Sequence, residues 1–347
     1  MPSPFRRLPA VLFLLLTLAV AACAGGGGTS IPPQATGAIA SVLTGTPAPS
    51  GAPSAAPSAA SFPLTVTDDE GTAVGVAARP QKIVSLTPAA TETLFAIGAG
   101  DRVVATDESS DFPKEASALP HVATFSSVDV EKIVKLDADL VVAGGLGFSP
   151  PEAIAKLRTL KIPVLVLYAA SVDGVYHDIE LVGTAVGDGP AATTLTAAMR
   201  TEIGAISQSA KGAGTPPRVY YEVGYTDATG QIFAPADQSF VAEMVTLAGG
   251  DAITTDDPAS YEIPLEMLIE RDPQVIILGV NPFYKPTPAQ VAKRPGWSVM
   301  TAVKDGQIRP VQDTEITRPG PRLATGLRNL VAAIWPDLAL PSGPSGP

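Results

Sequence analysis

Residues Val130–Val142 read VEKIVKLDADLVV, and residues Leu265–Ile277 read LEMLIERDPQVII. Each stretch begins with apolar residues at helical spacing, turns at an aspartate, and ends in a run typical of a buried strand. A second pair recurs in the same order, because Leu94–Asp101 (LFAIGAGD) resembles Met244–Asp251 (MVTLAGGD). Two matches in one order indicate a single internal duplication and therefore predict two similar α/β lobes.

Short β-branched runs surround these repeats and predict the strands of both lobes. Six such runs are clear: Lys82–Leu86, Arg102–Asp107, Asp139–Ala143, Pro163–Tyr168, Arg218–Val223 and Gln274–Val280. Helical patterns lie between them, as expected of mainly parallel sheets. Thr87 followed by Pro88 predicts the start of a helix, and Gly98 predicts its end. Residues Phe62–Ala77 predict a β-hairpin.

One helical pattern is placed to join the lobes. Residues Ser171–Val186 carry apolar residues at helical spacing. We therefore expect an N-terminal lobe over residues 62–170, a connecting helix over residues 171–187 and a C-terminal lobe over residues 188–347. The predicted fold is α/β, with two similar lobes whose central, mainly parallel sheets are joined by a single long helix. Such a connection predicts only modest hinge motion.

The N-terminus has the pattern of a bacterial export signal. Residues 1–22 contain two arginines, an apolar run over Val11–Val20 and then small residues. The apolar run is about half the length that spans a bilayer. Cys23 is the only cysteine of the chain, and the sequence VAAC that ends at it looks like a lipobox. We expect cleavage before Cys23, a lipid anchor on its thiol, and no internal disulfide.

The next segment predicts a flexible tether. Residues 23–61 contain no Lys, Arg, Asp or Glu and consist mostly of Gly, Ala, Pro, Ser and Thr. Such a composition cannot form a core. The whole chain carries a formal net charge of −11, and loss of the two signal arginines makes the body more acidic still. Nucleic acid is therefore not an expected partner.

Residue sets that support catalysis or metal binding are sparse. The sequence has no GxSxG elbow, no GxxxxGK phosphate loop and no cysteine left for nucleophilic work. The two histidines, His121 and His177, lie far apart, whereas bare Zn²⁺ or Mn²⁺ sites use several imidazole and carboxylate ligands. We expect a protein that is not an enzyme, with no metal site and no intrinsic cofactor.

Several short motifs together resemble one family, the helical-backbone binding proteins for vitamin B12, ferric siderophores and haem. The motifs are Lys82–Glu92 (KIVSLTPAATE), Gly98–Val104 (GAGDRVV), Ser110–Pro113 (SDFP), Ala248–Asp251 (AGGD), Pro295–Trp297 (PGW) and Arg318–Arg322 (RPGPR). The resemblance covers the body after the tether. It implies an extracytoplasmic substrate-binding lipoprotein of an ABC importer, anchored to the cell membrane.

The resemblance also implies a ligand cleft at the carboxyl ends of the strands of both lobes. The residues carried over to that cleft are Thr87, Phe125, Gly144, Phe233, Tyr261 and Arg318. The aromatic residues would supply apolar walls for a macrocycle, and Arg318 would meet a carboxylate, phosphate or amide on the rim of the ligand. Ser109 and Gly144 are small where corrin binders tend to carry large aromatics. A corrinoid of the vitamin B12 type or a ferric siderophore is the expected ligand, and the choice between these and haem stays open.

Glu131 and Glu266 occupy equivalent positions in the duplication, and the resemblance gives them a role in docking. Matching glutamates dock on the two subunits of a permease, which explains how a monomer with two lobes meets a two-fold partner. The expected partners are a permease dimer with its ATPase and a small chelate. A ligand-sensing lipoprotein for a membrane receptor and a chelatase-like enzyme are the alternatives.

Overall fold

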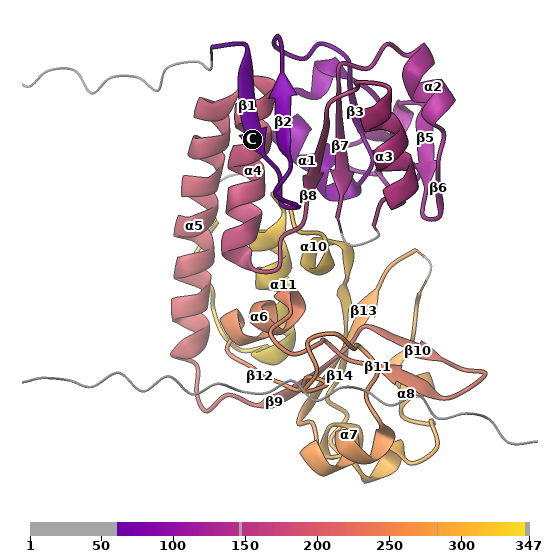
Figure 1. The fold of residues 1–347 in the computed structure, drawn as a ribbon. Coiled ribbons are helices and arrows are strands. Elements are labelled where there is room, and N and C mark those ends of the chain that lie inside the picture. Colours follow the sequence, from indigo (N-terminus) through magenta and orange to yellow (C-terminus); the bar gives the residue numbers. More distant parts are fainter. Residues whose placement is uncertain (1–60, 146–147, 283, 344–347) are drawn as a thin grey trace, which may run out of the picture. The chain divides into compact units, whose positions relative to one another are not determined.

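The computed structural model describes residues 61–145, 148–282 and 284–343. Cys23, the predicted signal over residues 1–22 and the predicted tether up to residue 60 lie outside the described residues. The body that follows is built on two separate, mainly parallel sheets (Figure 1). We call the six-stranded sheet with its helices the first lobe and the four-stranded sheet with its helices the second lobe.

The first lobe holds six strands in the order β6-β5-β4-β3-β7-β8. All neighbouring strands are parallel except β5 and β6. The strands are β3 (Ile83–Ser85), β4 (Val103–Asp107), β5 (His121–Thr124), β6 (Ser127–Val128), β7 (Leu140–Gly144) and β8 (Val164–Leu167). The predicted hairpin precedes them as the antiparallel pair β1 (Leu64–Thr67) and β2 (Ala73–Val76).

The second lobe holds four parallel strands in the order β12-β9-β13-β14. They are β9 (Arg218–Glu222), β12 (Asp251–Ala252), β13 (Val275–Val280) and β14 (Ile308–Gln312). A separate antiparallel hairpin consists of β10 (Gly224–Thr226) and β11 (Gln231–Phe233). The strand β14 contains Pro310, which has no backbone N–H to donate, and it accordingly lies at the edge of the sheet.

Helices cover both faces of each sheet. The α-helices are α1 (Pro88–Ala96), α2 (Val130–Lys135), α3 (Pro151–Thr159), α4 (Val172–Val186), α5 (Gly189–Lys211), α6 (Phe240–Leu247), α7 (Leu265–Arg271), α8 (Pro288–Val291), α9 (Thr301–Lys304), α10 (Thr314–Thr317) and α11 (Leu323–Ile334). Short 3₁₀ turns are η1 (Gly100–Arg102), η2 (Ala116–Ala118) and η3 (Trp297–Val299). Among the residues described, no helix has both the length and the apolar character required to cross a bilayer.

The internal duplication extends through both sheets. The strand order β4-β3-β7-β8 of the first lobe corresponds to β12-β9-β13-β14 of the second. The repeated segments form α2 followed by β7 and α7 followed by β13. The equivalent aspartates after these helices, Asp137 and Asp272, both adopt positive φ angles, 51° and 42°. The predicted α/β fold with mainly parallel sheets is therefore confirmed, and all six predicted strands form with ends within one residue of those expected.

The path between the lobes contains two helices where the sequence analysis expected one. The predicted helix is α4, whose first turn is capped by the Ser171 hydroxyl and which ends at Gly187 with φ of 79°. The 23-residue α5 follows and leads to β9, and the two helices run side by side (Figure 1). The sequence of α5 is rich in Ala and Thr and lacks a strong apolar stripe, so its periodicity is weak.

A single apolar core connects one face of each sheet. In β7 and β13 alternate residues divide between two clusters, as the pleat of a strand requires. Leu140 and Ile277 belong to a continuous cluster that also includes side chains of α1, α4, α5, α6 and α11. The opposite faces pack against α2 and α3 in the first lobe and against α7, α8 and α9 in the second. The two lobes therefore share buried apolar surface, which opposes their separation.

We predict that the body unfolds as one unit because of this shared core. Ile179 lies in α4 and is 1% exposed, so Ile179→Ala should lower the free energy of unfolding by about 2–5 kcal/mol. Urea unfolding should show one transition by circular dichroism and by tryptophan fluorescence. Fluorescence reports on the second lobe, because Trp297 packs in its core and Trp335 bonds Ala248. Val299→Ala, at a position 50% exposed, is the control. Two separate transitions would contradict the prediction.

Candidate ligand-binding site

Side chains that end the parallel strands of both sheets form the candidate site. We call these strand ends the carboxyl edge of each lobe. In open parallel sheets this edge is where ligands bind, because loops there leave a crevice and backbone dipoles converge. Of the residues predicted to face a ligand, Thr87 follows β3, Phe125 follows β5 and Gly144 ends β7. These three thus share the carboxyl edge of the first lobe.

Exposed aromatic and aliphatic side chains gather at these edges. Phe125 and Phe148 follow β5 and β7 and are 84% and 62% exposed. Tyr168 directly follows β8, and Val223 directly follows β9 in the second lobe; both are exposed. Exposed apolar side chains mark an interaction site where they lie together on a surface. Phe148 and Tyr168 were not among the residues predicted from sequence.

Tyr261 is half-exposed and belongs to the second lobe. Its carbonyl accepts a hydrogen bond from Ala234 at 2.8 Å, which ties it to the hairpin β10–β11. Partial burial raises the pKa of the Tyr261 phenol, and the nearby phenol of Tyr168 raises it further. Tyr168 of the first lobe thus acts electrostatically on the Tyr261 phenol of the second lobe.

Phe233 ends the same hairpin and is partly buried. Its carbonyl accepts hydrogen bonds from the Tyr220 hydroxyl at 3.2 Å and from the Val223 amide at 3.0 Å. These bonds hold the hairpin against the end of β9. Phe233 thus supports the carboxyl edge of the second lobe, next to the exposed Val223.

Gly144 lies in a crowded position. A Cβ atom there would lie 2.8 Å from the Thr87 methyl group and 2.8 Å from the Cβ of Phe148. From the sequence, Gly144 is noted only as a small residue where corrin binders tend to carry a large aromatic. In the structure Thr87 and Phe148 lie against it, while the Thr87 hydroxyl caps α1 by accepting from the Ala90 amide at 3.3 Å. The glycine allows Phe148 to pack close to the edge.

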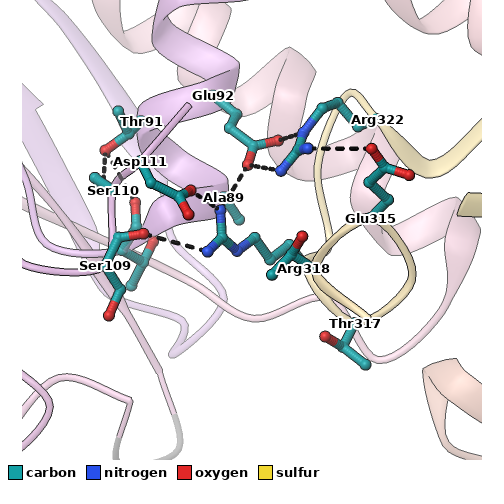
Figure 2. Close-up of polar contacts among 12 residues, drawn as sticks. Ala89, Thr91, Glu92, Ser109, Ser110, Asp111, Glu315, Thr317, Arg318 and Arg322 are labelled. Carbon is teal, nitrogen blue, oxygen red and sulfur yellow. Dashed lines mark hydrogen bonds and ion pairs between the residues drawn. The ribbon is translucent and has the colours of Figure 1, made fainter. Parts of the chain in front are cut away.

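Arg318 bridges the two lobes (Figure 2). Its Nη1 bonds Oδ1 of Asp111 at 2.6 Å and Oε1 of Glu92 at 3.3 Å, and its Nη2 donates to the Ser109 carbonyl at 3.3 Å. All three acceptors belong to the first lobe, whereas Arg318 follows α10 of the second. The arginine predicted to meet a ligand is thus already bonded to protein.

Glu92 is the buried centre of this cluster. Arg322 donates from Nε to Oε2 at 2.9 Å and from Nη2 to Oε1 at 2.7 Å. This fork geometry is the strongest form of the Arg–carboxylate pair, and the hydrogen bonds to Glu92 raise the pKa of Arg322. Arg322 also stacks on the Phe112 ring at 4.4 Å. Two arginines of the second lobe therefore share one carboxylate of α1.

A buried polar chain fixes the loop that faces Arg318. The Ser110 hydroxyl lies 2.8 Å from that of Thr91 and donates to Asp107, while Oδ2 of Asp107 accepts from the Ser109 amide at 2.9 Å. Burial raises the pKa of Asp107, against the effect of these hydrogen bonds. The loop after β4 is thus held to α1, with Asp111 directed at the arginine.

The second lobe has its own buried ion pair at the carboxyl end of β9. Glu222 ends β9 without exposure and binds Arg294 and the Tyr284 hydroxyl, the latter at 2.6 Å. The Arg294 guanidinium lies over the Tyr225 ring at 3.6 Å and over Trp297 at 4.7 Å. Burial and the Glu222 contact raise the pKa of Tyr284. These contacts fix the loop after β13.

The two glutamates of the duplication occupy equivalent places. Glu131 lies in the first turn of α2 and Glu266 in the first turn of α7, and both are exposed. A groove of about 450 Å³ adjoins Glu131, and it is also lined by Glu152 and Lys156 of α3. Both carboxylates are therefore available to a partner.

Within the described ranges, no three His, Cys, Asp or Glu side chains are grouped so that they could hold a metal ion. Both histidines are exposed. His121 begins β5 with its ring 3.3 Å from the Thr106 hydroxyl, and His177 lies in α4. Neither follows the carboxyl end of a strand.

Residues 83–313 match the family model for the periplasmic binding protein. The chain belongs to the periplasmic binding protein family. This match confirms the resemblance read from the sequence motifs.

Relatives of this periplasmic binding protein carry related names. The ABC transporter substrate-binding lipoprotein YvrC of Bacillus subtilis is 31% identical over 280 residues, which cover 80% of this chain and 87% of that protein. The vitamin B12-binding protein of Pectobacterium carotovorum is 27% identical and covers 74% of this chain and 89% of its own. The haem-binding protein RhuT from Roseiflexus has a TM-score of 0.66 at 25% identity, over 75% of this chain and 99% of that chain.

An acid pair positions Tyr168 at the edge. Asp69 accepts from the Tyr168 amide at 2.5 Å and donates its own amide to the Val166 carbonyl. Burial raises the pKa of Asp178 to about 8, and the facing Asp69 carboxylate adds to the increase. The folded protein therefore keeps the proton of Asp178 at pH values where an unfolded chain would release it.

We predict a pH dependence of stability from this pair. Because the folded pKa lies above the ordinary value of 3.8, stability should fall as the pH rises from about 4 toward about 8. Asp178→Asn should remove this slope and make the protein more stable than wild type at pH 9, by an amount on the order of a few kcal/mol. Melting temperatures across this range provide the measurement, with the exposed Asp101→Asn as control. An unchanged slope in Asp178→Asn would refute the assignment.

Proposed function

We propose that this periplasmic binding protein is the extracytoplasmic, lipid-anchored receptor of an ABC importer, and that it captures a corrinoid or a ferric-siderophore-type chelate. The observation that carries the proposal is the set of exposed apolar side chains at the carboxyl edges of both lobes. The partners are a permease dimer with its ATPase, and the receptor acts as a monomer.

The chemistry of the edges favours a large, partly apolar ligand. Phe125, Phe148 and Tyr168 on one lobe and Val223 and Tyr261 on the other offer apolar and aromatic surface from two sides. Vitamin B12 and haem, the ligands named for two of the relatives, are metal-centred macrocycles with broad faces that suit such walls. The ligand's metal arrives inside its chelate, so protein ligands for a bare ion are not required.

A thermal-shift panel tests the ligand class. Cyanocobalamin, dicyanocobinamide, haemin and a ferric hydroxamate siderophore are the probes. A ligand at a hundred times its dissociation constant stabilises the folded state by about 2.7 kcal/mol, so at least one probe should raise the melting temperature. Phe125→Ala should weaken binding of that probe about tenfold or more, since it removes one exposed ring that a bound ligand would bury.

Leu160→Ala is the matched control for Phe125→Ala. Leu160 is also exposed, but it lies before β8, at the amino end of the strands. Binding should be unchanged in this variant. If no probe shifts the melting temperature, the chelate assignment is wrong. If both alanine variants weaken binding equally, the ligand does not bind at the carboxyl edges.

We infer that Glu131 and Glu266 dock the receptor on its permease. Their equivalent positions in the duplication place one exposed carboxylate on each lobe, which suits a partner with two-fold symmetry. Carboxylates of this kind pair with arginines on the partner and contribute to specificity.

Charge reversal tests the docking residues. The double variant Glu131→Arg, Glu266→Arg should abolish uptake into proteoliposomes that contain the permease and ATPase, because both ion pairs become repulsive. Ligand affinity should stay at the wild-type value, since neither residue is among those proposed to face the ligand. Glu270→Arg reverses a charge one turn further along α7 and should retain transport. Normal uptake by the double variant would exclude these glutamates as docking residues.

We further propose that Cys23 carries the lipid that holds the receptor at the membrane. The support is its position directly after an export-type signal as the only cysteine. In Cys23→Ser, the protein should leave the membrane fraction and appear in the soluble extracytoplasmic fraction with unchanged ligand affinity. A variant that stays in the membrane fraction would show that another feature anchors the chain.

A further inference from the structure

The ion-pair cluster around Arg318 contains more acidic than basic side chains. Arg318 and Arg322 supply two positive charges, and their ion-pair partners Glu92, Asp111 and Glu315 supply three negative ones. The cluster at the seam of the two lobes (Figure 2) therefore has no surplus positive charge to offer an anion.

The partners of Arg318 differ in their access to water. The Glu92 side chain is 2% exposed and already shared with Arg322, so it is a fixed structural partner. The Asp111 side chain is 55% exposed and pairs with Arg318 alone. The Arg318 side chain is 15% exposed, so water reaches this pair mainly through Asp111 and weakens it there. Asp111 is thus the partner that water, or an incoming ligand group, can reach.

The loop around Asp111 is pre-organised for this contact. Ser109 and Asp111 both accept from Arg318, and the buried chain through Ser110 and Asp107 holds the loop against α1. Asp111 therefore reaches Arg318 at a low cost in conformational entropy. It shares Nη1 of Arg318 with Glu92, at 2.6 Å against 3.3 Å, and is the closer of the two carboxylates.

We propose that Asp111 is a specificity-determining residue, which occupies the anion position on Arg318 and thereby selects for ligands whose facing rim groups are neutral acceptors. A ligand amide can bond the cluster without disturbing it, whereas a ligand carboxylate or phosphate must displace Asp111 and meet the charge of Glu92. The proposal deepens the proposed function by naming the rim chemistry of its ligand.

Inorganic phosphate tests the proposal without any chelate. In protein labelled with ¹³C-arginine, the Cζ resonance of Arg318 is assigned by its loss in Arg318→Lys and followed during titration with sodium phosphate at constant ionic strength. Asp111→Asn should bind phosphate about fivefold more tightly than wild type, which corresponds to removal of one exposed ion pair. Glu115→Gln removes a nearby exposed charge and should behave as wild type.

Three results would overturn the proposal. Wild type and Asp111→Asn could titrate alike, Asp111→Asn could show no phosphate response, or Glu115→Gln could gain as much affinity as Asp111→Asn. Asp111 is exposed, so its change to Asn should leave the melting temperature nearly unchanged, which confirms that the variant is folded. Because phosphate is the probe, the outcome is independent of whether the chelate panel finds a ligand.

Discussion

One buried carboxylate joins the two lobes at the candidate site. Glu92 lies on α1 of the first lobe and is bonded by Arg318 and Arg322 of the second. Loss of a single partner from a buried pair typically costs about 3–5 kcal/mol, because a charge remains buried without compensation. The loop after β4, the two arginines and α1 are all held together by this contact. Their mutual placement sets which groups the two carboxyl edges present to a ligand.

The shared apolar core, like Glu92, holds the two lobes together. Side chains of α4 and α5 belong to one continuous cluster with residues from the inner faces of both sheets. Arg102 adds a polar contact, since it bonds the Val186 carbonyl and Asp188 at the turn between these helices. A body held by both a core and a buried ion cluster favours small adjustments at the edges over large rotations of the lobes. Under the proposed function, the side chains that would adjust to a ligand are those at the carboxyl edges, such as Tyr168 and Tyr261.

The sequence predicted the fold well, because its signals are local. The duplication appears as repeated helix–turn–strand segments, and the β-branched runs mark buried strands wherever they occur. The strand β14 was not predicted, because Pro310 interrupts its alternating pattern. The helix α5 was not predicted, because its Ala and Thr residues give little contrast between an apolar and a polar face. Both depend on tertiary neighbours for their stability.

The site was less predictable, because it depends on contacts between distant residues. Arg318 and Glu92 are 226 positions apart, and no local pattern states that they pair. Phe148 and Tyr168 could have been suggested by a simple rule, since each lies shortly after the carboxyl end of a predicted strand. The surroundings of Gly144 could not be predicted, because a glycine is compatible with either an open cavity or a close neighbour. Only the fold brings Thr87 and Phe148 next to it.

The central claim is that the two lobes, each with its carboxyl edge, stay at a fixed separation when the ligand binds. The distance between the lobes tests this claim. Cys23 is the only cysteine. In a Cys23→Ser background, the substitutions Leu160→Cys and Val299→Cys introduce one exposed labelling site on each lobe for a spin label. Double electron–electron resonance should give one narrow distribution of label-to-label distances, and its mean distance should not change when a stabilising ligand is added. A second, separate distance in the free or the bound protein would contradict the account.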